Sequence, residues 1–357
     1  MIMASLRVVN RLVCRGFIVL TLLLMFFNEV LIYYVAQSSW NPIDCKLENC
    51  TRLLLIADPQ ILGTSYDRSS HSPLARYDLD RYLQKSFERA VSFTQPHIIV
   101  FLGDLLDEGN IATAQEYKQY VRRFKRIYHN KRLMNRVHVP GDNDIGGDNG
   151  DYISNSNQRR FENEFMSEDL FDYDNHLRFF KINRMLLDFS NPDKDHNADR
   201  LRIGVSHAPL LIGGGPLLRA VISDLDPHII FSGHWHESRI FIYPSTKVIN
   251  FYENAVRHFD LKALKEQEHS YLEIMVPTCS YRMGKSKIGM GYAVLENYNL
   301  SYTVLWQPNR FILLFTYVFW GLFVLCCAIV YKMMTRCPFR VAKRQTLYSR
   351  VSNIPQF

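Results

Sequence analysis

Two long apolar segments near the ends of this 357-residue chain limit what the rest of it can fold into. Residues 17–36 form the first segment, and residues 311–331, which contain no charged side chain, form the second. A helix of about 20 apolar residues crosses the roughly 30 Å of hydrocarbon in a bilayer. We therefore predict two transmembrane helices, with the folded domain between them in residues 37–310.

The first segment raises two questions: whether it is cleaved as a signal peptide, and what contacts the acidic side chain inside it. A cleaved signal peptide is the alternative to a membrane span, but the apolar core is longer than usual and no A-x-A-like site follows it closely. Glu29 lies inside the segment, where a carboxylate costs about 2.5–3.5 kcal/mol. We favour an uncleaved span. Glu29 then contacts the second span or a lipid headgroup, or else water reaches it.

The charge of the chain is concentrated in its tails. The net charge is +7, from 42 basic and 35 acidic side chains. Residues 1–16 and 332–357 hold nine of the basic side chains and no acid, so residues 17–331 carry a net charge of −2. Basic residues that flank spans stay in the cytosol. The charge therefore indicates two cytosolic tails and a luminal or extracellular domain, and it gives no reason to expect a nucleic-acid partner.

Three local features fit a luminal domain. Asn49-Cys50-Thr51 and Asn299-Leu300-Ser301 are acceptor triplets for N-glycosylation. Cys45 and Cys50 follow the first span, where an oxidising lumen would permit a disulfide, although two free thiols remain an alternative.

The domain itself shows a repeated pattern of short apolar runs that end in polar residues. Such runs predict buried strands, and they cover residues 53–57, 97–102, 137–140, 202–206 and 227–232. Residues 80–95 and 113–128 carry apolar side chains at helical spacing. This alternation predicts a largely parallel α/β core whose ligands lie at the carboxyl ends of the strands.

The polar residues after these runs are of the kinds that bind metals. They are Asp58, Gln60, Asp104, Asp142, Asn143, Asp144, His207, His234 and His236. Oxygen and imidazole ligands without cysteine suit manganese, iron or zinc. An aspartate shared by two ions about 3.5–4 Å apart would complete a centre that clamps a phosphoryl group. His97, His138 and His228 precede or lie within the runs, so we predict that they belong to the core or its edge.

The order of these clusters resembles the signature of the calcineurin-like metallophosphoesterase superfamily across residues 53–236. The resemblance implies an α/β sandwich of two central mixed sheets flanked by helices, here between the two transmembrane helices. The chain is also similar to the membrane-bound members that remodel GPI anchors and to their yeast cell-division-control relatives. That similarity lies in the acid-then-Ile-Tyr-Tyr pattern of residues 29–34, in residues 103–109 and in residues 276–282.

This closer resemblance implies a dinuclear phosphodiesterase that uses manganese, with iron and zinc as alternatives. Its implied substrate is the ethanolamine phosphate of a GPI glycan, and its implied role is to support ER-to-Golgi transport of GPI-anchored proteins from the ER, ER exit sites or Golgi. One ion would be held by Asp58, Gln60, Asp104 and His236. The other would be held by Asp104, Asp142, His207 and His234.

Two departures from the family pattern bear on activity. Gln60 stands where many members have histidine. Residues 141–144 read G-D-N-D in place of G-N-H-D, so Asn143 takes the place of the histidine that protonates the leaving group. An amide cannot be a general acid, a role worth about 10²–10⁴ in rate. A one-residue slip would instead make Asn143 a ligand and Asp144 the substitute for the histidine.

Two alternative functions remain, and Asn143 motivates the first of them. A catalytically weakened membrane scaffold would keep the metals without turnover, and a phosphatase would act on another luminal phosphoester. The sequence predicts no oligomeric state.

Overall fold

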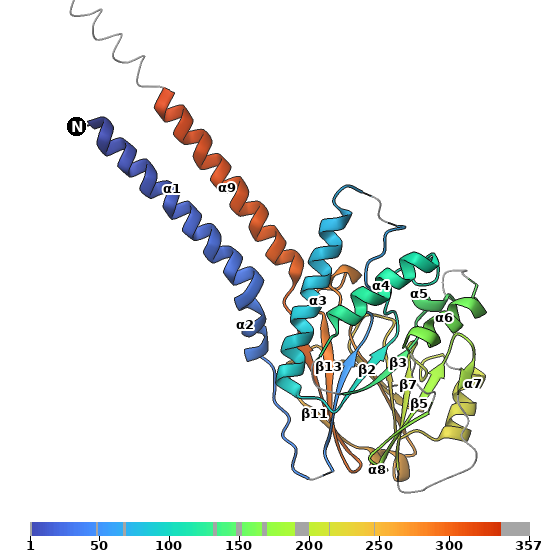
Figure 1. Cartoon of the computed structure of the whole chain (residues 1–357). Helices are drawn as coiled ribbons and strands as arrows, with labels where there is room; N and C mark the ends of the chain where they lie inside the picture. Colours follow the sequence, from blue (N-terminus) through green and yellow to red (C-terminus); the bar gives the residue numbers. More distant parts are fainter. Residues whose placement is uncertain are drawn as a thin grey trace, which may run out of the picture. The chain divides into compact units, whose positions relative to one another are not determined.

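The computed structural model describes residues 2–336 except 48, 67–68, 131–133, 148–151, 166–169, 190–199, 214 and 246 (Figure 1). The predicted basic tail therefore lies outside the described residues from position 337 onward. The chain divides into two compact units. One contains Met1–Glu29 and Arg310–Phe357, and the other is Val30–Asn309.

The terminal segments are helical. The first consists of α1 (Ile2–Phe26), a π-helical turn η1 (Phe27–Leu31) and α2 (Ile32–Ser38), and the last is α9 (Arg310–Arg336). Arg11–Ser38 and Arg310–Met334 are long and apolar enough to cross a membrane, by length and composition. Glu29 is partnered by the second of these helices, because its Oε1 lies 2.8 Å from an Arg310 guanidinium nitrogen and 2.8 Å from the Tyr317 hydroxyl.

Val30–Asn309 contains two β-sheets, and all five predicted strands are present. The six-stranded sheet has the order β11 (Arg257–Asp260), β14 (Asn299–Trp306), β13 (Gly289–Glu296), β1 (Thr51–Ile56), β2 (Ile98–Leu102), β3 (Asn135–Val139). The eight-stranded sheet has the order β10 (Lys247–Asn250), β9 (Arg239–Tyr243), β12 (Tyr271–Met275), β8 (Ile229–Ser232), β7 (Leu201–Ser206), β5 (Leu177–Asn183), β4 (Leu170–Tyr173), with β6 (Asp188–Phe189) paired to β5.

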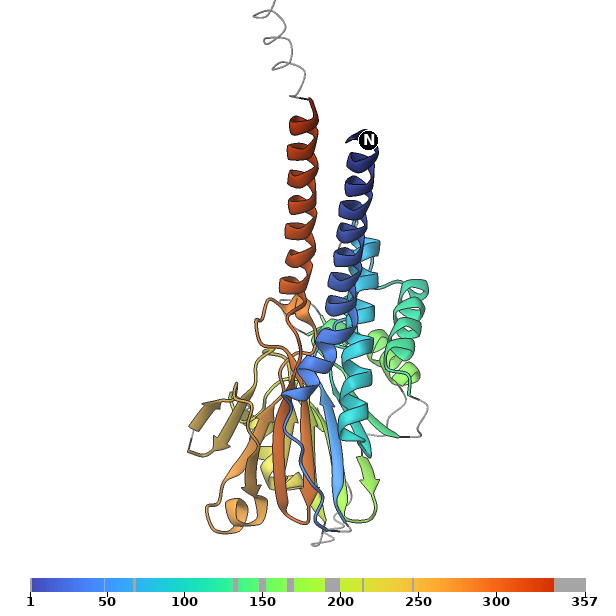
Figure 2. The ribbon, with the colours of Figure 1, turned by 90° about the vertical axis from the view of Figure 1, so that its left-hand side faces the viewer.

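Both sheets are mixed, as the family resemblance implies. Strands β1, β2 and β3 are parallel, and so are β5, β7, β8 and β12. Antiparallel strands extend each parallel group, and the long β13–β14 hairpin lies beside β1 (Figure 2). The expected parallel core is therefore correct for three adjacent strands of one sheet and four of the other, but it omits the antiparallel strands beside them.

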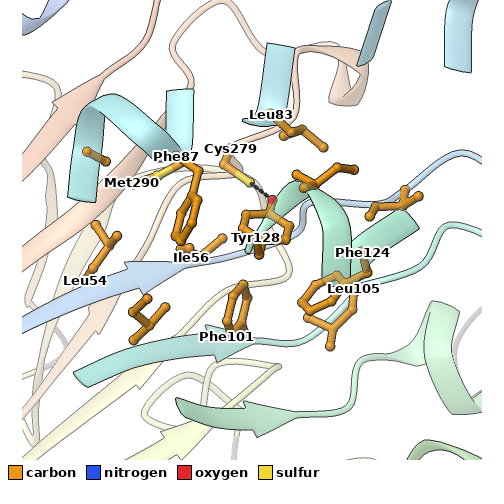
Figure 3. Close-up of a cluster of buried hydrophobic side chains, with 14 of the residues drawn as sticks. Leu54, Ile56, Leu83, Phe87, Phe101, Leu105, Phe124, Tyr128, Cys279 and Met290 are labelled. Atoms are coloured by element: carbon orange, nitrogen blue, oxygen red, sulfur yellow. Dashed lines mark hydrogen bonds between the residues drawn. The ribbon is translucent and has the colours of Figure 1, made fainter. Parts of the chain in front are cut away.

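The alternation of side chains along β1 shows how the layers stack. Leu53 and Leu55 belong to an apolar cluster that contains residues of both sheets, so they face the space between the sheets. Leu54 and Ile56 point the other way and pack under α3 (Ser72–Thr94) and α4 (Ala114–Ile127) (Figure 3). These two helices correspond to the predicted helical segments.

The remaining helices complete the outer layers. They are α5 (Asp142–Ile145), α6 (Asn155–Phe165), α7 (Gly215–Ala220), the π-helical turn η2 (Val221–Leu225), α8 (Leu261–Glu266) and the short η3 (Tyr281–Met283). Residues of α7 and η2 pack on the outward side chains of the eight-stranded sheet, such as Ile230. The result is a four-layer helix–sheet–sheet–helix sandwich.

The three histidines predicted to be structural have structural contacts. His97 and His228 each accept a backbone N–H through Nδ1, from Arg52 at 3.2 Å and from Arg202 at 3.1 Å. His138 is buried and stacks on Phe101, with ring centroids 5.0 Å apart. Of the two alternatives for Cys45 and Cys50, the structure contains the disulfide.

Candidate metal centre

The candidate ligands converge because the strands that precede them end at one edge of the sandwich. They follow β1, β2 and β3 in one sheet and β7 and β8 in the other. Two sets of side chains each place one ligand atom per residue within 4.8 Å of the others. The sets are Asp142, His207 and His234, and Asp58, Asp104 and His207.

The first set is built around one carboxylate oxygen. Asp142 begins α5, and its Oδ1 lies 3.0 Å from His207 Nε2 and 3.2 Å from His234 Nδ1. The two ring nitrogens are themselves 3.1 Å apart. One carboxylate oxygen and two imidazole nitrogens thus lie within about 3 Å of one another. Atoms with lone pairs come this close only when a cation or shared protons lie between them.

The second set adjoins the first through His207. Asp104 Oδ1 lies 3.5 Å from His207 Nε2, and Asp58 Oδ1 lies 3.9 Å from His207 Nδ1. His236 Nε2 lies 3.8 Å from the same Asp58 oxygen. His207 is therefore the residue that the two sets share, whereas Asp104, the predicted bridging carboxylate, belongs to the second set only.

Gln60 has a different orientation from the one its proposed role requires. Its amide nitrogen lies 3.0 Å from Asp104 Oδ2 and 3.3 Å from His236 Nε2. The predicted ligand atom is the carbonyl oxygen, which a half-turn of the amide would bring to this place.

The backbone at the centre adopts a conformation that the sequence does not reveal. Five candidate ligands have positive φ angles, namely Asp58 (50°), Gln60 (42°), Asp104 (51°), His234 (73°) and His236 (63°). Left-handed backbone costs about 1–2 kcal/mol per non-glycine residue. Such strain persists where the surrounding fold enforces it, and it clusters at functional sites.

Gly103 is required for one of these turns. Its φ is 89°, and an added Cβ would lie 2.4 Å from His207 Nδ1. Only glycine lets the strand end approach the imidazole this closely.

The electrostatics of the centre favour a bound cation. Burial, together with the neighbouring carboxylates, raises the pKa of Asp58 and of Asp104. Burial also acts to raise the pKa of Asp142, but hydrogen bonds from His207 and His234 hold it below its usual range. Bound divalent ions would offset the repulsion between these carboxylates. The oxygen and imidazole ligands suit manganese, iron or zinc. The residues present therefore fit a divalent metal centre.

Asn143 and Asp144 differ in their contacts. Asn143 faces the centre, where its Nδ2 donates to Asp104 Oδ2 at 3.1 Å. Asp144 is fully buried, and its oxygens accept backbone N–H groups of Gly141, Leu105 and Leu106 at 2.9–3.1 Å. Asp144 thus fixes the loops that carry Asp104 and Asp142.

Several residues around the centre had no signal in the sequence pattern. Thr278 donates its hydroxyl to the Asp58 carbonyl at 2.9 Å and so supports the first ligand. Lys285 donates to Glu237 at 2.6 Å. Burial, with smaller effects of His207, His234 and Lys285, lowers the pKa of His236 to about 4. The family resemblance covers only the wider segment 276–282.

The sequence of residues 51–238 matches the calcineurin-like phosphoesterase family, which is more than half of the chain. This chain belongs to the calcineurin-like phosphoesterases. The chain thus contains a calcineurin-like phosphoesterase domain over residues 51–238 with a candidate Asp/His metal site.

Individual relatives are more distant. "Metallophosphoesterase 1" of Ailuropoda melanoleuca is 28% identical over 171 residues, which are 46% of this chain and 42% of that protein. The "Metallophosphoesterase 1 homolog" of Drosophila melanogaster is 27% identical over 138 residues, 36% of this chain and 35% of that protein. The matched stretch thus spans less than half of either relative. A solved metallophosphoesterase from Sphaerobacter thermophilus covers 72% of this chain and 88% of its own, with 14% identity and a TM-score of 0.36, a likeness too distant to bear on activity.

Proposed function

We propose that this phosphoesterase is a membrane-anchored phosphodiesterase with a dinuclear metal centre, and that it removes ethanolamine phosphate from the glycan of GPI anchors. The convergence of three carboxylates and three imidazoles at one edge of the sandwich carries the proposal of a metal-dependent hydrolase. The GPI substrate rests on the likeness of residues 29–34, 103–109 and 276–282 to the GPI-remodelling members.

The proposed ligand roles come from the family resemblance. Asp58, Gln60, Asp104 and His236 would hold one ion, and Asp104, Asp142, His207 and His234 the other. When bound, such ions polarise the phosphoryl oxygens and supply a hydroxide nucleophile near neutral pH. His207 is fixed for its role because Nδ1 lies 2.8 Å from the Leu102 carbonyl oxygen. We propose manganese as the metal.

The compartment is also a proposal. The Cys45–Cys50 disulfide is of the kind that persists in oxidising compartments. Asn299, the acceptor of the second glycosylation triplet, is exposed at the start of β14. These observations support a luminal domain in the ER, ER exit sites or Golgi with both tails cytosolic.

Hydrolysis by the purified full-length chain tests the enzymatic part. With manganese and bis-p-nitrophenyl phosphate, we expect Asp104→Asn to lose at least about 10²-fold in rate, because the bridging charge is removed. Asp224→Asn, an exposed aspartate on η2, is the matched control. Equal rates for the wild type and Asp104→Asn would refute a metal-dependent hydrolase.

The substrate needs a separate experiment in cells that lack the protein. We expect slower ER exit of GPI-anchored cargo and GPI glycans that retain an extra ethanolamine phosphate by mass spectrometry. The wild-type gene should restore both, and Asp104→Asn should not. Normal glycans in the deficient cells would exclude GPI and leave another luminal phosphoester as the substrate.

A second function is favoured by one observation. Asn143 occupies the place of the usual proton donor, and its amide is bonded to Asp104 Oδ2. A scaffold that binds metal without turnover would show this feature. Stoichiometric metal with no hydrolysis of any phosphodiester would favour it.

A further inference from the structure

The most exposed apolar side chains of Val30–Asn309 lie in a few segments that connect strands to the following elements. Among the residues that the structure describes there, five large apolar side chains are at least 65% exposed. They are Tyr66, Leu74, Tyr77, Tyr152 and Leu187, which we call the apolar rim. Single exposed apolar residues are common, but several on one edge indicate an interaction surface.

All five rim residues follow the carboxyl ends of strands. Tyr66 lies between β1 and α3, and Leu74 and Tyr77 occupy the first turns of α3. Tyr152 lies between α5 and α6, after β3, and Leu187 lies in the turn after β5, which is parallel to β7. The metal ligands occupy the connections at this same edge. Figure 1 shows α5, α6 and the start of α3 at the end of the sheets toward which β2 and β3 point.

The chain also leaves this unit for its two apolar helices at the ligand-bearing edge. Strand β14 is antiparallel to β13, which is antiparallel to β1, so β14 runs in the direction of β1. It therefore ends at Trp306 on the ligand-bearing edge, three residues before the unit ends at Asn309.

The incoming chain reaches the same place. Tyr33 of α2 packs on Tyr82 of α3, with ring centroids 6.0 Å apart, and the Tyr82 hydroxyl donates to the Pro308 carbonyl at 3.0 Å. Tyr82 is five residues after Tyr77, a rise of about 8 Å along a helix. The two chain connections to the apolar helices thus lie close to part of the apolar rim.

We propose that the ligand-bearing edge of Val30–Asn309 lies against the surface of the lipid bilayer, with the apolar rim in its interfacial layer. Tyrosine is enriched at this depth, and leucine gains from burial there. This proposal rests on the proposed membrane anchoring. It also narrows the class of substrate, because the metal centre would then accept phosphoesters carried by lipids in the same leaflet.

Tryptophan quenching tests the contact directly. The full-length chain in nanodiscs of brominated phosphatidylcholine is compared with nanodiscs of unbrominated lipid. We expect Leu74→Trp to add a tryptophan that brominated lipid quenches beyond the wild-type background. Val248→Trp is the control, because Val248 is 46% exposed in β10 near the turn at the opposite edge. Quenching of Leu74→Trp no greater than that of Val248→Trp would overturn the proposal.

A kinetic comparison tests its consequence. The double variant Leu74→Glu with Tyr77→Glu should lose about tenfold in rate on phosphatidyl-p-nitrophenol in the nanodisc, because the edge is held away from the lipid. It should keep its rate on soluble bis-p-nitrophenyl phosphate. Equal losses on both probes would contradict the proposal. A wild type that hydrolyses neither probe would refute the proposed activity, while the quenching result would still decide the lipid contact.

Discussion

His207 Nδ1 lies 2.8 Å from the carbonyl oxygen of Leu102, the last residue of β2. A carbonyl can only accept a hydrogen bond, so Nδ1 carries a proton and Nε2 is the nitrogen that would bind a metal. Nε2 faces Asp142 and Asp104, at 3.0 and 3.5 Å. The end of β2 in the six-stranded sheet thereby orients His207, which follows β7 in the eight-stranded sheet. Hydrogen bonds of this kind orient many metal-bound histidines.

His207→Asn should abolish the metal centre while the fold remains. The shorter amide cannot reach both the Leu102 carbonyl and the ligand set, so we expect loss of bound metal and a rate reduction of at least about 10²-fold. Metal analysis and phosphodiester hydrolysis measure the two effects. His258→Asn, an exposed histidine bonded to Ser301, should leave both unchanged. Retained metal in His207→Asn would refute this ligand assignment.

Gly103→Ala should damage the centre through the backbone. The added methyl group would meet the His207 side chain at 2.4–2.8 Å, in addition to the strain of alanine at a φ of 89°. We expect a loss of about 2–3 kcal/mol in unfolding free energy together with lower metal affinity. Gly284→Ala is a matched control, with a φ of 67° and no atom within 4 Å of its Cβ. Equal effects on metal affinity in the two variants would show that the contact with His207 does not matter.

The positions of the ligands were predictable because strand ends leave a clear pattern. The run at 53–57 places β1 within two residues of its observed start and within one of its end, and the polar residue that follows is Asp58. Which sheet a strand joins is a different matter. The part of a run at 98–102 is apolar throughout, so its period does not tell which strands it pairs with.

Other features could not be predicted for identifiable physical reasons. Strand β13 contains Gly289 and Gly291, which weaken a strand signal, yet it is buried at the centre of the sheet. The left-handed backbone at Asp58 and Asp104 is enforced by tertiary contacts, since aspartate has no strong preference for that conformation. The inward orientation of Asn143 and the backbone contacts of Asp144 likewise depend on how α5 meets the loop after β2.

Asn143→His tests whether a missing proton donor limits the rate. An imidazole at this position could protonate a leaving alkoxide, which the amide cannot do, so we expect a gain of about 10-fold or more on alkyl phosphodiesters. A p-nitrophenyl ester needs no such proton and should change little. Kinetics with both ester types, measured with equal bound metal, separate the effects. Lower rates on both would indicate that the Asn143–Asp104 bond is needed to hold the carboxylate.

Buried His138 should make the fold less stable in acid. Burial, with smaller effects of nearby cations, lowers the pKa of His138 to about 3, whereas an unfolded histidine titrates at about 6.5. Between these values only the unfolded chain binds the proton, so stability is complete above about pH 6.5 and falls as the pH decreases, by up to about 1.4 kcal/mol per unit. Denaturant unfolding from pH 7 to pH 5 measures the slope. The unfolding free energy of His138→Phe should change less with pH than that of the wild type. An unchanged dependence on pH would show that His138 is not its source.

The Glu29–Arg310 pair should stabilise the packing of the two terminal helices. Glu29 Oε1 accepts from both Arg310 and Tyr317 at 2.8 Å, and the Arg310 side chain is almost completely buried. Removing either charge takes its counter-charge from the other, at a cost of about 3–5 kcal/mol, whereas replacing both by apolar groups restores much of the loss. We therefore expect Glu29→Leu and Arg310→Leu each to lower the thermal midpoint of the detergent-purified chain and the double variant to raise it again. A double variant that loses the sum of the two single losses would show that the charges do not interact.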